Sequence, residues 1–191
     1  MYKLLLAAFF CICILVSCTS KNDYGSWKMY GGNSDNNHYS SLSQIDTNNV
    51  QQLQVAWTYH TGDADTAGHS QIQCNPIMVN GLLYGTTPRL KLFAVDAATG
   101  IQKWVFDPAG GTKSAPMNFG MNNSRGFTYW EDGGDKRILF CAGSNIYAIN
   151  AENGQLVSSF GDGGKVDLHS DLGIDAQKMY VTATTPGIIY K

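Results

Sequence analysis

From residue 76 onward, short apolar runs alternate with turn residues, a pattern typical of antiparallel strands joined by tight turns. Four successive runs, at 76–79, 82–86, 92–96 and 102–106, form the first group of expected strands. Asn80-Gly81 separates the first two runs and is a strong hairpin signal. The pattern therefore predicts a four-stranded antiparallel meander.

A second group repeats this pattern, with expected strands at 137–141, 146–150 and 155–160. Residues 94–100 (Ala-Val-Asp-Ala-Ala-Thr-Gly) align with residues 148–154 (Ala-Ile-Asn-Ala-Glu-Asn-Gly), 54 positions further on. This spacing suits one propeller blade plus a loop. Alternation resumes at 178–182, where a third unit is expected to begin. The sequence thus predicts an all-β fold, a partial β-propeller of about three four-stranded antiparallel blades.

Composition agrees with this fold class and excludes one class of partner. Of the 191 residues, 21 are glycine and only 15% are charged, as expected for strands joined by many tight turns. The net charge of −2 leaves no basic stripe that could neutralise phosphates. We therefore expect no nucleic acid partner.

The first 18 residues predict an exported lipoprotein. Lys3 precedes an apolar run at 4–16, which is the length of a secretory signal. Leu15-Val16-Ser17-Cys18 resembles the bacterial lipobox, in which the cysteine is acylated. We expect a signal peptide at 1–17, a lipidated Cys18 that begins a tether at 18–26, and anchoring to a lipid bilayer at the periplasmic or outer membrane. The alternative is a signal anchor with an accidental cysteine.

Two cysteines, Cys74 and Cys141, would remain in the folded part of the exported chain. Export permits a disulfide between them. Each also lies in or beside an apolar run, where a buried free thiol is equally consistent. The sequence leaves both possibilities open.

A turn motif in the first group carries a family resemblance. Its residues are Ala94, Asp96, Thr99, Gly100 and Trp104. The aspartate can accept turn amides, the glycine can adopt positive φ, and an aromatic side chain follows on the next strand. The motif resembles the tryptophan-docking motif of quinoprotein alcohol dehydrogenases, in which the indole packs between neighbouring blades. We expect a structural role for these residues.

The second copy of this motif is degenerate. Asn150 replaces the aspartate, Asn153 replaces the threonine, and Phe160 is the displaced aromatic residue.

Flanking segments narrow the resemblance. Trp27-x-x-Tyr30-Gly31-Gly32-Asn33 and the stretch at 56–63 resemble the amino-terminal blade of glucose and quinate dehydrogenases that use pyrroloquinoline quinone (PQQ). The stretch at 160–164 and Thr185-Pro186-Gly187 resemble later landmarks of that group. The resemblance covers residues 27–191, which we assign to a PQQ-type propeller domain.

This resemblance implies an eight-bladed propeller with PQQ and calcium near its axis and an aspartate as catalytic base. Only about three blades fit into this sequence. The calcium ligands and the base are therefore expected beyond Lys191, and no catalytic or metal-binding residue is assigned. We expect an amino-terminal fragment that is inactive alone.

Two residues match family positions that contact the cofactor. Arg125, in Asn-Asn-Ser-Arg-Gly, suits the quinone's carboxylates because its planar fork binds them bidentately. Gln73 matches a Glu or Gln that projects toward the cofactor. The alternatives are a solvated loop arginine and a strand-end polar group. Met121 stands where membrane-bound glucose dehydrogenases carry a histidine, which leaves glucose as the substrate in doubt.

The histidines and the Asp-Gly stretches lack the spacing of metal ligands. The histidines are His38, His60, His69 and His169, and we expect each to be solvated or locally hydrogen-bonded. The stretches at 132–135 and 162–164 are expected to be turns.

The sequence thus predicts part of a PQQ-dependent dehydrogenase that oxidises a sugar or polyol and passes electrons to a respiratory quinone or cytochrome c. The alternative is a non-catalytic propeller lipoprotein that acts as a protein-interaction scaffold.

Overall fold

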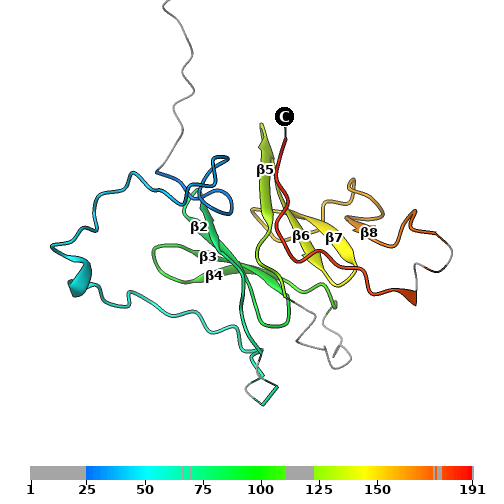
Figure 1. Cartoon of the computed structure of the whole chain (residues 1–191), viewed down its shortest axis with the longest axis horizontal. Helices are drawn as coiled ribbons and strands as arrows, with labels where there is room; N and C mark the ends of the chain where they lie inside the picture. Colours follow the sequence, from blue (N-terminus) through cyan, green and yellow to red (C-terminus); the bar gives the residue numbers. More distant parts are fainter. Residues whose placement is uncertain are drawn as a thin grey trace, which may run out of the picture.

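Two antiparallel four-stranded sheets form the body of the computed structural model, which describes residues 25–65, 67–68, 70–110, 123–173, 175 and 178–190 (Figure 1). The first sheet contains β1 (Ile77–Val79), β2 (Leu82–Thr86), β3 (Leu92–Asp96) and β4 (Gln102–Phe106) in chain order. The second contains β5 (Thr128–Asp132), β6 (Asp135–Ala142), β7 (Asn145–Asn150) and β8 (Lys165–Asp167). The predicted all-β fold with four-stranded antiparallel sheets is confirmed.

Apart from these strands, the described chain is mostly irregular. The only described helix is the short 3-10 turn η1 (Val50–Gln52). Within the described ranges, no helix is long and apolar enough to cross a membrane. The predicted signal peptide and Cys18 lie outside the described residues.

The core lies between the two sheets. Successive side chains on a strand point to opposite faces of its sheet, so every second residue of a strand faces the neighbouring sheet. In the first sheet the register aligns Tyr84 with Ala94, and Ala94 with Trp104. In the second, Ile138 is aligned with Tyr129 and with Ile149. All of these residues are buried in one apolar cluster that joins both sheets.

The second sheet differs from the prediction at its outer strand. The strand expected at 155–160 is wrong, since Leu156 makes only an isolated bridge to Ile149 and the chain turns at 157–160. The outer position is taken by β8, which pairs with β7. Gly161, Gly163 and Gly164 have positive φ and fold the chain back before β8 begins.

Two further boundaries differ from the sequence pattern. Strand β5 was not predicted, and it forms a hairpin with β6 around the expected turn at Asp132–Asp135. The third unit expected at 178–182 contains no strand. Instead, the segment that follows runs beside β5, where the Thr128 hydroxyl donates a 2.7 Å hydrogen bond to the Gly187 carbonyl (Figure 1).

Two indoles join successive units through equivalent hydrogen bonds. Trp104 Nε1 donates to the Ala151 carbonyl at 3.1 Å, and the Tyr84 hydroxyl donates to the same oxygen at 3.1 Å. Trp57, in the extended segment before the first sheet, donates to the Ala97 carbonyl at 3.2 Å. Ala97 and Ala151 occupy matching positions in the repeated turn, so each indole anchors to the turn of the next unit.

The repeated turn keeps its geometry despite the changes in its sequence. Asp96 Oδ1 accepts hydrogen bonds from the amides of Ala98 and Thr99, and Asn150 Oδ1 accepts from those of Glu152 and Asn153. An amide oxygen accepts as a carboxylate oxygen does. The degenerate second copy therefore folds as the first does.

Glycine ends each of these turns because an indole lies directly above it. Gly154 has a φ of +75°, and a Cβ atom there would lie 2.7 Å from the ring of Trp104. We predict that Gly154→Ala destabilises the protein more than Gly133→Ala, whose φ is +57° with nothing within 4 Å. Both variants carry a backbone cost of about 1–2 kcal/mol. The indole clash adds roughly 1–3 kcal/mol to Gly154→Ala alone.

Urea denaturation of both variants checks this prediction. In a Trp104→Ala background the extra loss at position 154 should disappear, because the clashing ring is gone. Equal losses for the two glycine variants in the wild-type background would contradict the role of the indole.

Candidate cofactor-binding site

Three segments that are distant in sequence are joined by backbone hydrogen bonds next to the first strands of the sheets. The amide of Asn75, just before β1, donates to the Arg125 carbonyl at 3.0 Å. The amide of Arg125, just before β5, donates to the Thr184 carbonyl at 2.8 Å. We call Asn75, Arg125 and Thr184 the inner ladder. It places the segments that precede β1 and β5 and the segment around residue 184 side by side.

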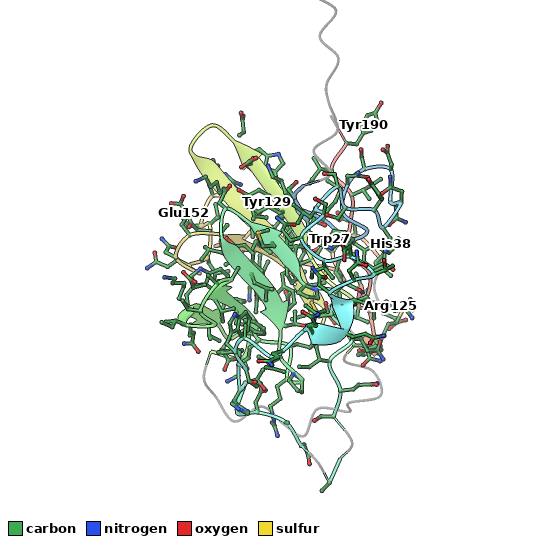
Figure 2. All side chains as sticks on the ribbon, turned by 90° about the vertical axis from the view of Figure 1, so that its left-hand side faces the viewer. Trp27, His38, Arg125, Tyr129, Glu152 and Tyr190 are labelled. Atoms are coloured by element: carbon green, nitrogen blue, oxygen red, sulfur yellow. The ribbon has the colours of Figure 1, made fainter. Side chains whose placement is uncertain are left out.

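Arg125 has a fixed backbone and an available side chain. Besides the ladder bonds, the Asn75 side-chain amide donates to the Arg125 carbonyl at 3.3 Å. The neighbouring Ser124 is buried, and its hydroxyl donates to the Gly126 carbonyl at 3.0 Å. The guanidinium is exposed and has no hydrogen bond or ion pair with any described residue. It lies far from the outer turn that carries Glu152 (Figure 2).

Gln73 lies two residues before Asn75, so the inner ladder brings its segment next to Arg125. The Gln73 side chain is half-buried and has no hydrogen bond with the described chain. The ladder therefore brings together the two segments that carry the predicted cofactor residues.

Two residues on either side of Gln73 contact the end of β2, namely Asp63, ten positions before it, and Cys74, directly after it. The Thr87 hydroxyl donates a 2.6 Å hydrogen bond to Asp63 Oδ2, ahead of Gln73 in the chain. The thiol of Cys74 is hydrogen-bonded with Thr86, directly after it. Burial raises the pKa of the Cys74 thiol, and the bonds with Thr86 oppose that rise in part. Because its pKa is raised above the usual value, the Cys74 thiol is protonated at neutral pH.

The two cysteines left open by the sequence are both free thiols. Burial raises the pKa of the Cys141 thiol as well. Met121 lies outside the described residues, so its relation to Arg125 is not defined.

Two hollows flank β5, and the sequence pattern gave no signal for either. The larger, of about 460 Å³, lies between residues 28–36 and residues 186–189. In its wall, the Tyr129 hydroxyl donates a 2.8 Å hydrogen bond to Glu131 Oε2, and Lys28 lies 3.6 Å from the Glu131 carboxylate. Burial and this bond raise the pKa of Tyr129, and the same bond lowers the pKa of Glu131.

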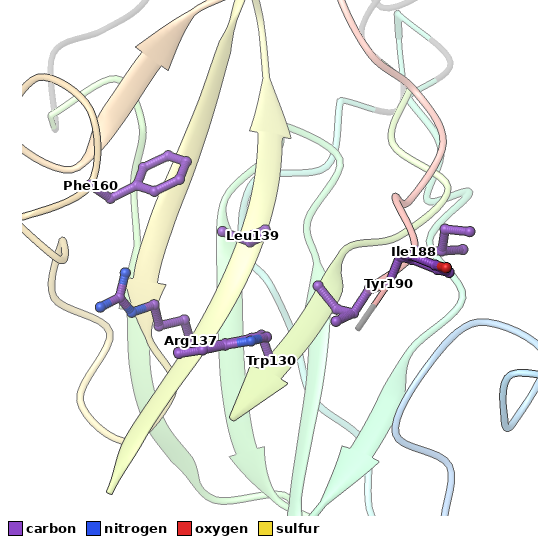
Figure 3. A pocket seen from close by; sticks show the side chains of 7 residues that line it. Trp130, Arg137, Leu139, Phe160, Ile188 and Tyr190 are labelled. Carbon is purple, nitrogen blue, oxygen red and sulfur yellow. The ribbon is translucent and has the colours of Figure 1, made fainter. Parts of the chain in front are cut away.

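The smaller hollow, of about 380 Å³, contains a second arginine (Figure 3). Arg137 Nε donates to Asp135 Oδ1 at 2.8 Å, and its guanidinium lies 5.3 Å from the centre of the Trp130 ring. This arginine is neutralised by its partner and stacked on an indole. Neither hollow is lined by Gln73 or Arg125.

The described histidines are dispersed. His38 stacks edge-on against Tyr30, His60 is exposed, and His169 is paired with Asp167. His69 lies outside the described residues. Among the described residues there is no group of three His, Cys, Asp or Glu side chains that could hold a metal ion.

Comparison with protein families identifies one match. The β-propeller domain of glucose, ethanol and alcohol dehydrogenases that use PQQ matches residues 27–191.

Individual relatives agree with this family. A quinoprotein glucose dehydrogenase of Escherichia coli is 34% identical over 178 residues, covering 85% of this chain and 22% of the relative. The dehydrogenase subunit of a quinone-dependent alcohol dehydrogenase of Gluconobacter oxydans is 36% identical, covering 71% of this chain and 17% of the relative. A quinohemoprotein alcohol dehydrogenase of Pseudomonas putida superposes with a TM-score of 0.65 at 26% identity, covering 87% of this chain and 22% of that structure. The chain spans about a fifth of the length of these relatives.

Proposed function

Because the chain belongs to the family of PQQ β-propeller domains of glucose, ethanol and alcohol dehydrogenases, we propose that it forms part of an enzyme that oxidises a sugar or polyol. In this proposal the chain supplies one side of the cofactor pocket. The observation that carries it is the inner ladder, which fixes the Arg125 backbone while its guanidinium has no hydrogen bond or ion pair with the part of the chain that the structure describes.

The donor set of this site fits PQQ. The quinone bears three carboxylates and ring carbonyls, all of which are hydrogen-bond acceptors. Arg125 offers a planar, permanently charged fork for a carboxylate, and the Gln73 amide offers N–H donors for a carbonyl or carboxylate oxygen. Bound PQQ supplies the two-electron acceptor for oxidation of an alcohol carbon. The residues of this chain would bind and orient it.

The proposed substrate class remains broad for a physical reason. Met121 stands at the position where membrane-bound glucose dehydrogenases have a histidine. Its thioether cannot donate a hydrogen bond or a proton as an imidazole can. We therefore propose a sugar or polyol rather than glucose alone. Electrons would pass to a respiratory quinone or cytochrome c. Calcium would accompany PQQ, with its ligands and the catalytic base supplied from outside the described residues.

Dye-linked oxidation tests this function. The whole protein, supplied with PQQ and calcium, is expected to reduce an artificial electron acceptor with at least one member of a sugar and polyol panel. Omitting either PQQ or calcium should abolish the reduction. If PQQ does not bind and no substrate reduces the dye, the scaffold lipoprotein becomes the better account.

A substitution of Arg125 tests the proposed cofactor contact. A hydrogen bond to a charged group contributes about 1.5–3 kcal/mol, so Arg125→Ala should weaken PQQ binding by about 10- to 150-fold. The PQQ affinity of Arg125→Lys should lie between those of Arg125→Ala and the wild type, because lysine keeps the charge but lacks the planar fork of donors. Equilibrium dialysis of the whole protein with PQQ measures both.

Arg137→Ala is the matched control for this measurement. It removes the same charge from an arginine that is already bound to Asp135. PQQ affinity should be unchanged in this variant. An unchanged affinity in Arg125→Ala would remove Arg125 from the proposed site.

We also propose that Cys18 carries the membrane anchor, on the strength of the lipobox-like segment. Cys18→Ser should release the protein from the membrane fraction, since acyl chains contribute about 0.8 kcal/mol per buried methylene. Fractionation, together with labelling by a radioactive fatty acid, checks this. A Cys18→Ser protein that stays in the membrane fraction would favour the signal-anchor alternative.

A further inference from the structure

His169 connects the end of the second sheet to the segment that returns toward the inner ladder. Its Nδ1 lies 2.7 Å from Asp167 Oδ1, at the end of β8. Its Nε2 lies 3.1 Å from the Met179 carbonyl oxygen. The side chain is only 11% exposed, and each ring nitrogen lies within hydrogen-bond distance of one of these partners.

Both of these partners can only accept hydrogen bonds. An ionised carboxylate and a backbone carbonyl carry no proton, whereas a neutral imidazole carries one N–H. With that N–H directed at Asp167, the lone pair of Nε2 would face the Met179 oxygen at 3.1 Å. Both contacts can be hydrogen bonds donated by the ring only when the ring holds two protons, as the imidazolium ion.

The two sides of this contact are fixed to different parts of the fold. On one side, the Leu168 amide donates to the Ser144 carbonyl at 2.8 Å, which ties the end of β8 to the β6–β7 turn. On the other side, the Thr182 hydroxyl donates to the Gly143 carbonyl at 2.7 Å. Two residues later, the Thr184 carbonyl accepts a hydrogen bond from the Arg125 amide.

We propose that His169 is a proton-dependent clasp that holds residues 178–180 against the end of β8 and releases them when the imidazole becomes neutral. Asp167 on β8 is the charged group that faces the ring, and the 178–180 segment presents the Met179 carbonyl to it. Lys178 in that segment is paired with Asp175 at 2.7 Å. This inference goes beyond the proposed dehydrogenase function and does not depend on it.

The direction of the pH dependence follows from the partners. The hydrogen bond to Asp167, and then the bond to Met179, raise the pKa of His169. In the unfolded chain the pKa of a histidine is about 6.5. Because the pKa of His169 is higher in the folded protein, its charged form stabilises the fold fully below about pH 6.5, and this stabilisation is lost as the pH rises through the folded-state pKa. The clasp is therefore closed in mildly acidic solution and opens toward alkaline pH.

Nuclear magnetic resonance of the whole protein labelled with ¹⁵N-histidine tests the clasp. At about pH 6 both ring nitrogens of His169 should show the imidazolium pattern, and Asp167→Asn should lower its titration midpoint. Hydrogen exchange at the amides of residues 180–183 provides the structural readout. After correction for intrinsic rates, their protection should fall by up to about tenfold per pH unit above the midpoint, in step with the imidazolium fraction.

Two variants separate the clasp from general effects of pH. His169→Phe should remove the pH dependence of protection at 180–183 while leaving the protein folded. His60→Gln removes an exposed histidine from another part of the chain and should leave that dependence unchanged. A neutral His169 ring at pH 6, or protection that does not follow its titration, would overturn the proposal.

Discussion

The carbonyl oxygen of Ala151 accepts two hydrogen bonds from the neighbouring sheet, one from the Trp104 indole and one from the Tyr84 hydroxyl. Ala151, Tyr84 and Trp104 are all buried, so any other packing of the two sheets that lost these bonds would leave buried donors unpaired, which is costly. This contact fixes how far apart the two sheets lie and how they are turned. The inner ladder depends on it, because Asn75 and Arg125 meet only when their sheets are held in this relation.

The sequence predicted the first sheet well because its signals are local. Asn80-Gly81 marks a hairpin, and the turn from Asp96 to Gly100 carries its own hydrogen-bond acceptors. The indole contacts could be expected only through family resemblance, since nothing in the local pattern says that Trp104 reaches residue 151. The repeated pattern also predicted a strand at 155–160, ending at the displaced aromatic residue Phe160, and the structure does not form this strand.

The errors in the second sheet have a common physical cause. Strand assignment at 155–160 relied on apolar alternation, but the glycines at 161–164 allow the chain to reverse and present Lys165–Asp167 to β7 instead. Strand β5 was missed because its short run lies next to a stretch of charged and glycine residues. The strand forms because it pairs with β6, where Thr128 lies opposite Leu139, and this pairing supplies the stability that local propensity does not. The hollows beside β5 are made by segments far apart in the sequence, so no linear pattern marks them.

Arg125 and Arg137 show why residue type alone does not define a binding site. Both are arginines close to the start of the second sheet, yet Asp135 and Trp130 already engage the guanidinium of Arg137. The backbone of Arg125 is held by Asn75 and Thr184, and its charge faces no partner among the described residues. A rigid backbone reduces the entropy lost when a ligand binds, and an unpaired guanidinium has no ion pair to break first. These two properties, which a sequence motif alone does not reveal, are the reason for proposing Arg125 rather than Arg137 as a contact for an anionic cofactor.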